Sequence, residues 1–371
     1  MPIPSLPLDI VVEIVSHLEE EDKIANQTQE GKTISLVCRS WRWIGQDLRW
    51  KTVRIGTSTL PSLSDHFARF PHLTKLVRLF IFADPLLLVP DRQSSPELPH
   101  FLSTLVNLHE LSIRGFFEEN LVPTLRAAST LGNLRTMQIR EYGEFEYVNE
   151  FSTSLQNGFK ELDSLAFTAL GYQSYSTARH EDLGESVSSK LSISRAVIEW
   201  SSEPFDSPKL ASDFLSILDP ATLSVVSLKD EAICTTSIRW LSHCQNLVEL
   251  NLALHWFEDF STVLPFLPHF ASLKEFNLEL TKEKEEAQSP VPLCDILTSL
   301  PPSLRFFVAD QLIFSDFSHI PIRHLWTSRD IESITYVSGR CLSDDEFEGE
   351  TTMLSLWAEE EDAKLKWFRM P

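Results

Sequence analysis

Glycine and cysteine are both scarce in this chain, and basic residues are outnumbered by acidic ones. Only 11 of the 371 residues are glycine, against an average usage of about 7%, which leaves few positions for the glycine-rich loops that hold nucleotide phosphates. The 32 lysines and arginines face 53 acidic residues, and the formal net charge is -21. Because nucleic-acid binding depends on clustered positive charge, we expect no nucleic-acid partner.

The five cysteines are odd in number and scattered along the chain. This usage favours reduced thiols in the cytoplasm or nucleus over a disulfide framework. No apolar run is long enough to span a bilayer. Asp9 and Glu13 interrupt the N-terminal apolar stretch, where a signal peptide would need an unbroken one. We therefore expect a soluble protein of the cytoplasm or nucleus, with no membrane partner.

Hydrophobic residues cover a wide sector of the first expected helix, in residues 7–18. Pro7, Ile10 and Ile14 lie on one stripe, and a second apolar stripe runs beside it. Together the two stripes cover roughly 200° of the helix surface. Such a helix is expected to contact a second protein, unless the rest of the chain covers the extra face. A polar stretch at 19–32 predicts a loop, and the helical pattern resumes after it, either as one helix or as two that meet near Ser40.

The order and spacing of these N-terminal residues resemble an F-box. The match comprises Leu6 and Pro7, the first apolar stripe, the run S-L-V-C-R-S-W at 35–41 and L-R-W at 48–50. The acidic loop after Leu18 is longer than the family's usual connection. The resemblance implies a three-helix module that docks on the Skp-type adaptor of a cullin-RING ubiquitin ligase. By motif position, the residues implied to dock or to form the module's core are Leu6, Pro7, Ile10, Ile14, Leu36, Val37, Cys38 and Trp41.

A loose repeat, with apolar residues spaced three, three and then two apart, begins near residue 70. Its clearest copies end at Ile113, Ile139, Phe167, Leu252 and Leu278. Neighbouring copies are separated by 26 residues (113 to 139), 28 (139 to 167) and 26 (252 to 278), within the leucine-rich-repeat range of roughly 20 to 29. Each copy predicts one short strand, whose last two apolar residues point inward while the residue between them faces outward.

The repeats resemble leucine-rich repeats more loosely than the N-terminus resembles an F-box, because the asparagine or cysteine that usually follows the strand is not consistently present. The predicted fold is α/β, with an N-terminal three-helix F-box (1–55), an irregular leucine-rich-repeat-like solenoid (56–342) and an acidic C-terminal tail (343–371). The alternative is that the repeats are strands of an ordinary α/β domain. A curved array exposes its outward strand positions side by side. The candidate contacts for a target protein are Ser112, Arg114, Gln138, Arg140, Asn251, Ala253, Asn277 and Glu279.

No arrangement in the sequence predicts catalysis, a metal or a cofactor. The nearest approach to a metal site is Cys234, His243 and Cys244, which lack both a paired C-x-x-C and a fourth ligand. Cys244 also occupies an apolar position of a repeat, so we expect it to be buried. His255 and Trp256 follow an expected strand, either at a rim where ligands are met or as packing residues. No phosphate-binding loop, nucleophile elbow or zinc-protease motif is found.

The resemblance and the repeat together predict a non-enzymatic substrate-recognition adaptor. Its N-terminus would dock on the Skp-type adaptor and the cullin scaffold, and its repeats would bind an unknown target protein. The alternative is a non-degradative repeat scaffold or regulatory binding protein.

Overall fold

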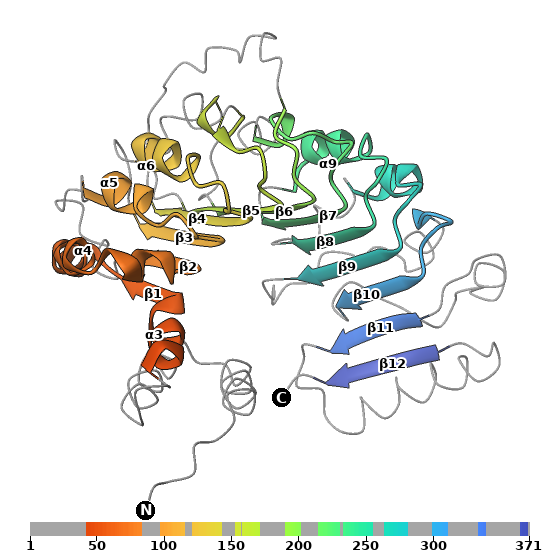
Figure 1. Ribbon diagram of the computed structural model, residues 1–371. Helices are drawn as coiled ribbons and strands as arrows, with labels where there is room; N and C mark the ends of the chain where they lie inside the picture. The colour runs from red at the N-terminus through yellow and green to blue at the C-terminus, as the bar shows by residue number, and fades with distance from the viewer. Residues whose placement is uncertain are drawn as a thin grey trace, which may run out of the picture. The chain divides into compact units, whose positions relative to one another are not determined.

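The computed structural model describes residues 42–83, 97–115, 121–142, 153–156, 158–170, 190–201, 214–230, 233–254, 263–280, 299–310, 333–338 and 364–369. The chain divides into two compact units. Unit 1 consists of Met1–Glu141 and Thr153–Leu162, and unit 2 consists of Tyr142–Ser152 and Asp163–Pro371. Helices and strands carry the labels of Figure 1.

Unit 1 contains parallel strands that pair in chain order, β1 with β2, β2 with β3 and β3 with β4. These strands are β1 (Thr52–Ile55), β2 (Leu79–Ala83), β3 (Glu110–Gly115) and β4 (Thr136–Tyr142). The helical segments around them are α3 (Arg42–Lys51), η1 (Thr57–Thr59), α4 (Leu60–Arg69), η2 (Pro71–Lys75), α5 (Glu97–Ser103) and α6 (Leu121–Ala128). Figure 1 shows α5 and α6 on one side of β3 and β4, and these two helices contact each other.

Unit 2 repeats this arrangement, with each strand pairing in parallel with the next. Its strands are β5 (Ser164–Leu170), β6 (Arg195–Ser201), β7 (Val225–Asp230), β8 (Glu249–Leu254), β9 (Glu275–Leu280), β10 (Phe306–Asp310), β11 (Ser333–Ser338) and β12 (Lys364–Arg369). Its helical segments include α9 (Thr235–Leu241) and η5 (Leu264–His269). Cys234 caps α9, because its sulfur accepts a hydrogen bond from the Ser237 backbone N–H at 3.4 Å.

The core of each unit lies between the strands and the helical connections. In unit 1 the Phe101 ring of α5 packs against Phe80 of β2, with ring centroids 5.4 Å apart. In unit 2 the Phe276 and Phe307 rings, on neighbouring strands, stack at 5.6 Å. These aromatic side chains are large apolar groups removed from water, so they are expected to supply much of the stabilisation.

The alternation of buried and exposed residues explains why these segments form strands. In β9 the buried Phe276 and Leu278 alternate with Glu275 and Glu279, which are exposed. This period of two is that of a β-strand. By contrast, Phe80, Ile81 and Phe82 of β2 are all buried, as is usual for a parallel strand covered on both faces.

The strand positions predicted from the repeat are confirmed. Ile139 lies beside Ile113 in the register of β3 and β4, and Leu278 lies beside Leu252 in that of β8 and β9. Residues at equivalent places in successive repeats are therefore spatial neighbours, because a parallel pairing in constant register brings together residues one period apart.

The predicted fold, an N-terminal three-helix F-box followed by an irregular leucine-rich-repeat-like solenoid, is wrong. The described residues form an α/β fold of parallel strands and helices, the alternative that the sequence left open. In this fold α3 ends at Lys51 and β1 begins at Thr52. The repeat pattern did not distinguish the two folds. A strand, a helix and their connections occupy a similar number of residues in a parallel α/β sheet and in a repeat array.

Candidate functional site

The eight predicted target contacts form two groups of four on the strands. In unit 1, Ser112 pairs with Gln138 and Arg114 pairs with Arg140 in the register of β3 and β4; we call these four residues the arginine block. In unit 2, the register of β8 and β9 pairs Asn251 with Asn277 and Ala253 with Glu279; these four form the asparagine block. Within each block the side chains share one face, because residues two apart on a strand point the same way.

In the arginine block, Arg114 and Gln138 are exposed, while Arg140 is half-buried. Ser112 was predicted as an outward position that could contact a target, but it is buried, with an exposed fraction of only 4%. A serine side chain is short, and it lies between Ile81 and Gln138 in the same row of neighbouring strands. The Ser112 hydroxyl oxygen is buried without a hydrogen-bond partner, although a buried hydroxyl usually has one.

One hydrogen bond joins the two asparagines of the asparagine block, and a second links the block to Glu249. The Asn277 amide donates to the side-chain oxygen of Asn251, and the Asn251 amide donates to the Glu249 carboxylate at 2.8 Å. Glu279 is exposed as predicted. Ala253 is 5% exposed, so its prediction as an accessible contact is wrong. Its single methyl lies between the longer side chains of Lys229 and Glu279 in the same row.

The two blocks differ in charge. Around the asparagine block, Glu249 and Glu275 are neighbours in register, and Glu279 follows on the same face. The arginine block instead brings two guanidinium groups to adjacent strands. Complementary charge guides the choice of partner at a protein surface. The arginine block is therefore suited to an anionic group and the face around the asparagine block to a cationic one.

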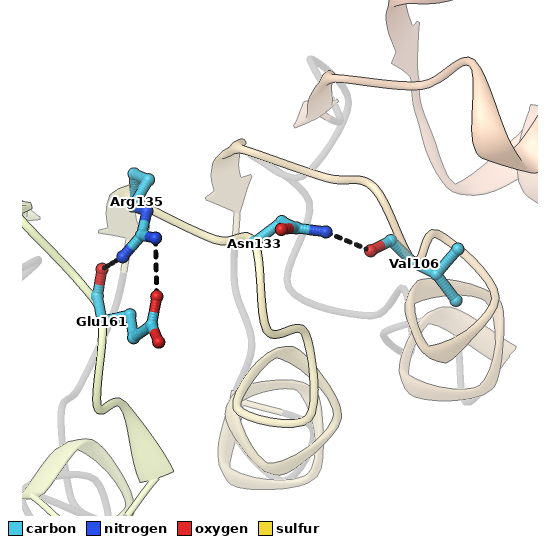
Figure 2. A network of polar contacts seen from close by, with 4 residues as sticks. All are labelled: Val106, Asn133, Arg135 and Glu161. Carbon is cyan, nitrogen blue, oxygen red and sulfur yellow. Dashed lines mark hydrogen bonds and ion pairs between the residues drawn. The ribbon is translucent and has the colours of Figure 1, made fainter.

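A second set of polar residues, which the sequence did not reveal, joins successive turns before each strand (Figure 2). The Asn133 amide donates to the Val106 backbone carbonyl at 3.1 Å. Nearby, Arg135 donates to the Glu161 backbone carbonyl at 2.8 Å and pairs with the Glu161 carboxylate at 2.6 Å. Both of these side chains are largely exposed, so the ion pair itself is expected to add less than about 1 kcal/mol.

Equivalent hydrogen bonds occur in both units, always from a residue three positions before a strand. They run from Asn107 to the Lys75 carbonyl, from Thr222 to the Ile193 carbonyl, from Asn246 to the Ala221 carbonyl and from Ser303 to the Leu273 carbonyl. The asparagines stand directly before an apolar repeat position, as in L-V-N-L and L-G-N-L. The polar signature of leucine-rich repeats follows the strand, whereas these residues lie before it.

Asn133→Ala is expected to lower the free energy of unfolding by about 0.5 to 1.5 kcal/mol, because it removes one hydrogen bond between successive turns. Urea unfolding monitored by circular dichroism measures this change. Gly132→Ala is the matched control, since the added Cβ would have no heavy atom within 4 Å. If Asn133→Ala is as neutral as the control, these hydrogen bonds do not stabilise the turns.

The candidate metal-binding residues do not assemble into a reactive site. Cys244 is 3% exposed, which confirms its predicted burial. Burial, together with the Asp219 carboxylate, raises the pKa of the Cys244 thiol to about 12, despite the opposing charge of Lys190. His243 is exposed, and the Cys234 sulfur contacts the Ser237 hydroxyl at 3.1 Å. Within the described part of the chain, no three histidine, cysteine or acidic side chains are grouped to hold a metal ion.

Several predicted residues lie outside the described part of the chain. His255 and Trp256 are two of them. The others are the predicted adaptor contacts Leu6, Pro7, Ile10, Ile14, Leu36, Val37, Cys38 and Trp41.

No helix among the described residues is long and apolar enough to cross a membrane. Comparison of the sequence with models of known protein families and with curated proteins finds no match.

Proposed function

We propose that this protein is a non-catalytic receptor that brings a target protein to a cullin-RING ubiquitin ligase. The observation that carries the binding role is the row of outward positions on parallel strands, where Arg114, Gln138 and Glu279 are exposed and Arg140, Asn251 and Asn277 are half-buried. Such faces present several side chains at fixed spacing, which suits them to protein recognition. Transfer chemistry would belong to other subunits of the ligase.

Docking on the Skp-type adaptor rests on the F-box resemblance of residues 6–50. One structural feature supports this division of roles. The motif ends with Leu48, Arg49 and Trp50 in α3, which runs directly into β1. A target bound to unit 1 would then be held close to the docked end of the chain, and proximity and orientation accelerate the transfer step.

Ile10→Asp and Trp41→Ala, combined in the full chain, are expected to reduce co-purification with the Skp-type adaptor by at least about tenfold. A charge placed in an apolar contact and the loss of an indole each cost more than the 1.4 kcal/mol that corresponds to this factor. Asp9→Asn and Trp43→Ala are matched controls. Asp9 lies on the polar side of the expected helix, and Trp43 has an exposed fraction of 55%. Both controls are expected to retain binding.

Undiminished adaptor binding by a folded double variant would contradict the docking role. A different result separates the receptor from a non-degradative scaffold. If docking holds, but no protein gains ubiquitin or changes in abundance with the level of this chain, the scaffold is the correct function.

A further inference from the structure

Aromatic rings form a continuous row in unit 1, from α3 across α4 to η2. The Trp50 ring stacks on His66 of α4, with centroids 5.4 Å apart. The His66 ring in turn lies 5.0 Å from that of Phe70, and Phe70 lies 6.3 Å from His72. We call these four residues the aromatic row. Trp50 also meets the buried Phe67 ring at 5.2 Å, so the row is attached to the core.

One end of the aromatic row is exposed to solvent. Phe70 has an exposed fraction of 45% and His72 is also exposed, whereas Trp50 and His66 are half-buried. A single exposed apolar side chain is common on a protein surface and needs no explanation. Phe70 differs because two further rings contact it and extend the flat surface. A continuous exposed surface of this kind is typical of a site of protein contact.

The residues around the aromatic row carry positive charge. Seven lysines and arginines but only two acidic residues occur in 42–83, which gives a formal charge of +5. The whole chain carries -21, so its other residues together carry -26. The Arg49 guanidinium lies 5.0 Å from the centre of the Trp50 ring, and its buried Nε has no hydrogen-bond partner. Arg69 is exposed and shares one face of α4 with His66, because residues three apart are neighbours on a helix.

We infer that the aromatic row docks a short acidic segment of a partner protein, one that carries an aromatic or aliphatic side chain among its acids. The acidic side chains would pair with Arg49 and Arg69, and the apolar side chain would cover the Phe70 ring. Complementary charge selects the partner, and apolar contact with the ring adds affinity. Arg69 and Phe70 belong to neither surface of the proposed function, because the docking motif spans residues 6–50 and the candidate target contacts lie on strands.

The small number of cations beside the aromatic row restricts the class of partner. Arg69 and Lys75 are the two lysines or arginines that α4 and η2 contribute. A nucleic acid is bound through many phosphate contacts, and attraction to an anionic membrane typically needs a cluster of about four to eight basic residues. A short acidic peptide needs fewer cations and gains from a flat aromatic surface. The aromatic row is therefore better matched to a peptide.

Fluorescence anisotropy of labelled peptides with the full chain tests this inference. The probes are short peptides rich in glutamate and aspartate, with one central phenylalanine, tryptophan or leucine. Each has two partners, one with alanine at the centre and one with lysine in place of every acid. At least one acidic peptide is expected to bind at least about tenfold more tightly than both of its partners. Phe70→Ser should weaken this binding by about tenfold, and Arg69→Gln by about threefold.

Phe306→Ser and Arg126→Gln are the matched controls. Phe306 is an aromatic residue of unit 2 with an exposed fraction of 36%, and Arg126 is an exposed arginine of α6 in unit 1. Neither change should alter peptide binding. Phe70→Ser and Arg69→Gln should co-purify with the Skp-type adaptor as the unchanged chain does, because both residues lie outside the docking motif.

Four results would overturn the inference. They are no preference for any acidic peptide, equal losses in the two controls, binding of phosphatidylserine vesicles instead of peptides through Phe70 and Arg69, and loss of the adaptor in Phe70→Ser. The vesicle result would indicate a membrane site, and loss of the adaptor would assign this surface to adaptor docking. The outcome is separable from that of the proposed function. A chain that binds acidic peptides through Phe70 but does not bind the adaptor contradicts the ligase role alone.

Discussion

Phe101→Ala is expected to lower the free energy of unfolding of unit 1 by about 3 to 5 kcal/mol. The Phe101 ring is 2% exposed and lies between two other aromatic rings. It stacks on Phe67 of α4, with centroids 5.7 Å apart, and meets Phe80 of β2 at 5.4 Å. Truncation would leave a cavity where α4, α5 and β2 meet. The expected loss of free energy of unfolding includes both the lost burial of the ring and its lost contacts with the two neighbouring rings.

Chemical denaturation followed by tryptophan fluorescence measures this loss, because Trp50 contacts Phe67 at 5.2 Å and reports on the same region. Val106→Ala is the control, since Val106 is 50% exposed and follows α5 in the same repeat. It should change the free energy of unfolding by less than about 0.5 kcal/mol. A loss below about 1 kcal/mol in Phe101→Ala would show that this aromatic cluster is not a central part of the core.

Cys244 is expected to react with iodoacetamide about a thousandfold more slowly in the folded protein than in urea at pH 8. Only the thiolate is nucleophilic. Burial, and secondarily Asp219, raises the pKa of this thiol from its ordinary value of 9.0 to about 12. Because the pKa is about three units higher in the folded protein, the thiolate fraction at pH 8 is about a thousandfold lower there.

Isotope-coded alkylation with mass spectrometry resolves Cys244 from the other cysteines. In the folded protein its labelling rate should keep rising above pH 9, whereas in urea it should level off there. Labelling of the folded protein as fast as in urea would contradict the buried, protonated thiol. The same shift predicts that the free energy of unfolding is unaffected below about pH 9 and falls as the pH rises toward about 12, since the unfolded thiol ionises first.

The strands were predictable because their signal is local. Leu250, Leu252, Phe276 and Leu278 alternate with polar residues, and a period of two permits only one side of a strand to face the core. The 26-residue spacing of the copies that end at 252 and 278 also indicated which residues would become neighbours, such as Asn251 and Asn277. The arrangement of the whole chain was not predictable in the same way. A period of about 26 residues is compatible with more than one way of stacking strand and helix.

The strand positions of the candidate residues were predictable, but their exposure to solvent was not. Arg114, Gln138 and Glu279 are exposed. Ser112 and Ala253 are buried on the same faces, because their short side chains lie between longer ones on neighbouring strands. The alternation of residues along a strand predicts toward which face of the sheet a side chain points. Its access to solvent depends on the size of residues that are remote in sequence.

The sequence by itself determined the places of the strands in the clear repeat copies, the burial of Cys244 and the absence of familiar catalytic motifs. These follow from the spacing and type of residues along one short segment at a time. The sequence did not indicate β1 or β12, which lie in the predicted F-box and the predicted acidic tail. Only the tertiary structure decided that the fold is a parallel α/β arrangement, that Ser112 has an unpartnered hydroxyl beside two arginines, and that Asn133 joins successive turns. Each of these depends on distances between segments about 25 residues or more apart in the chain, which no local pattern specifies.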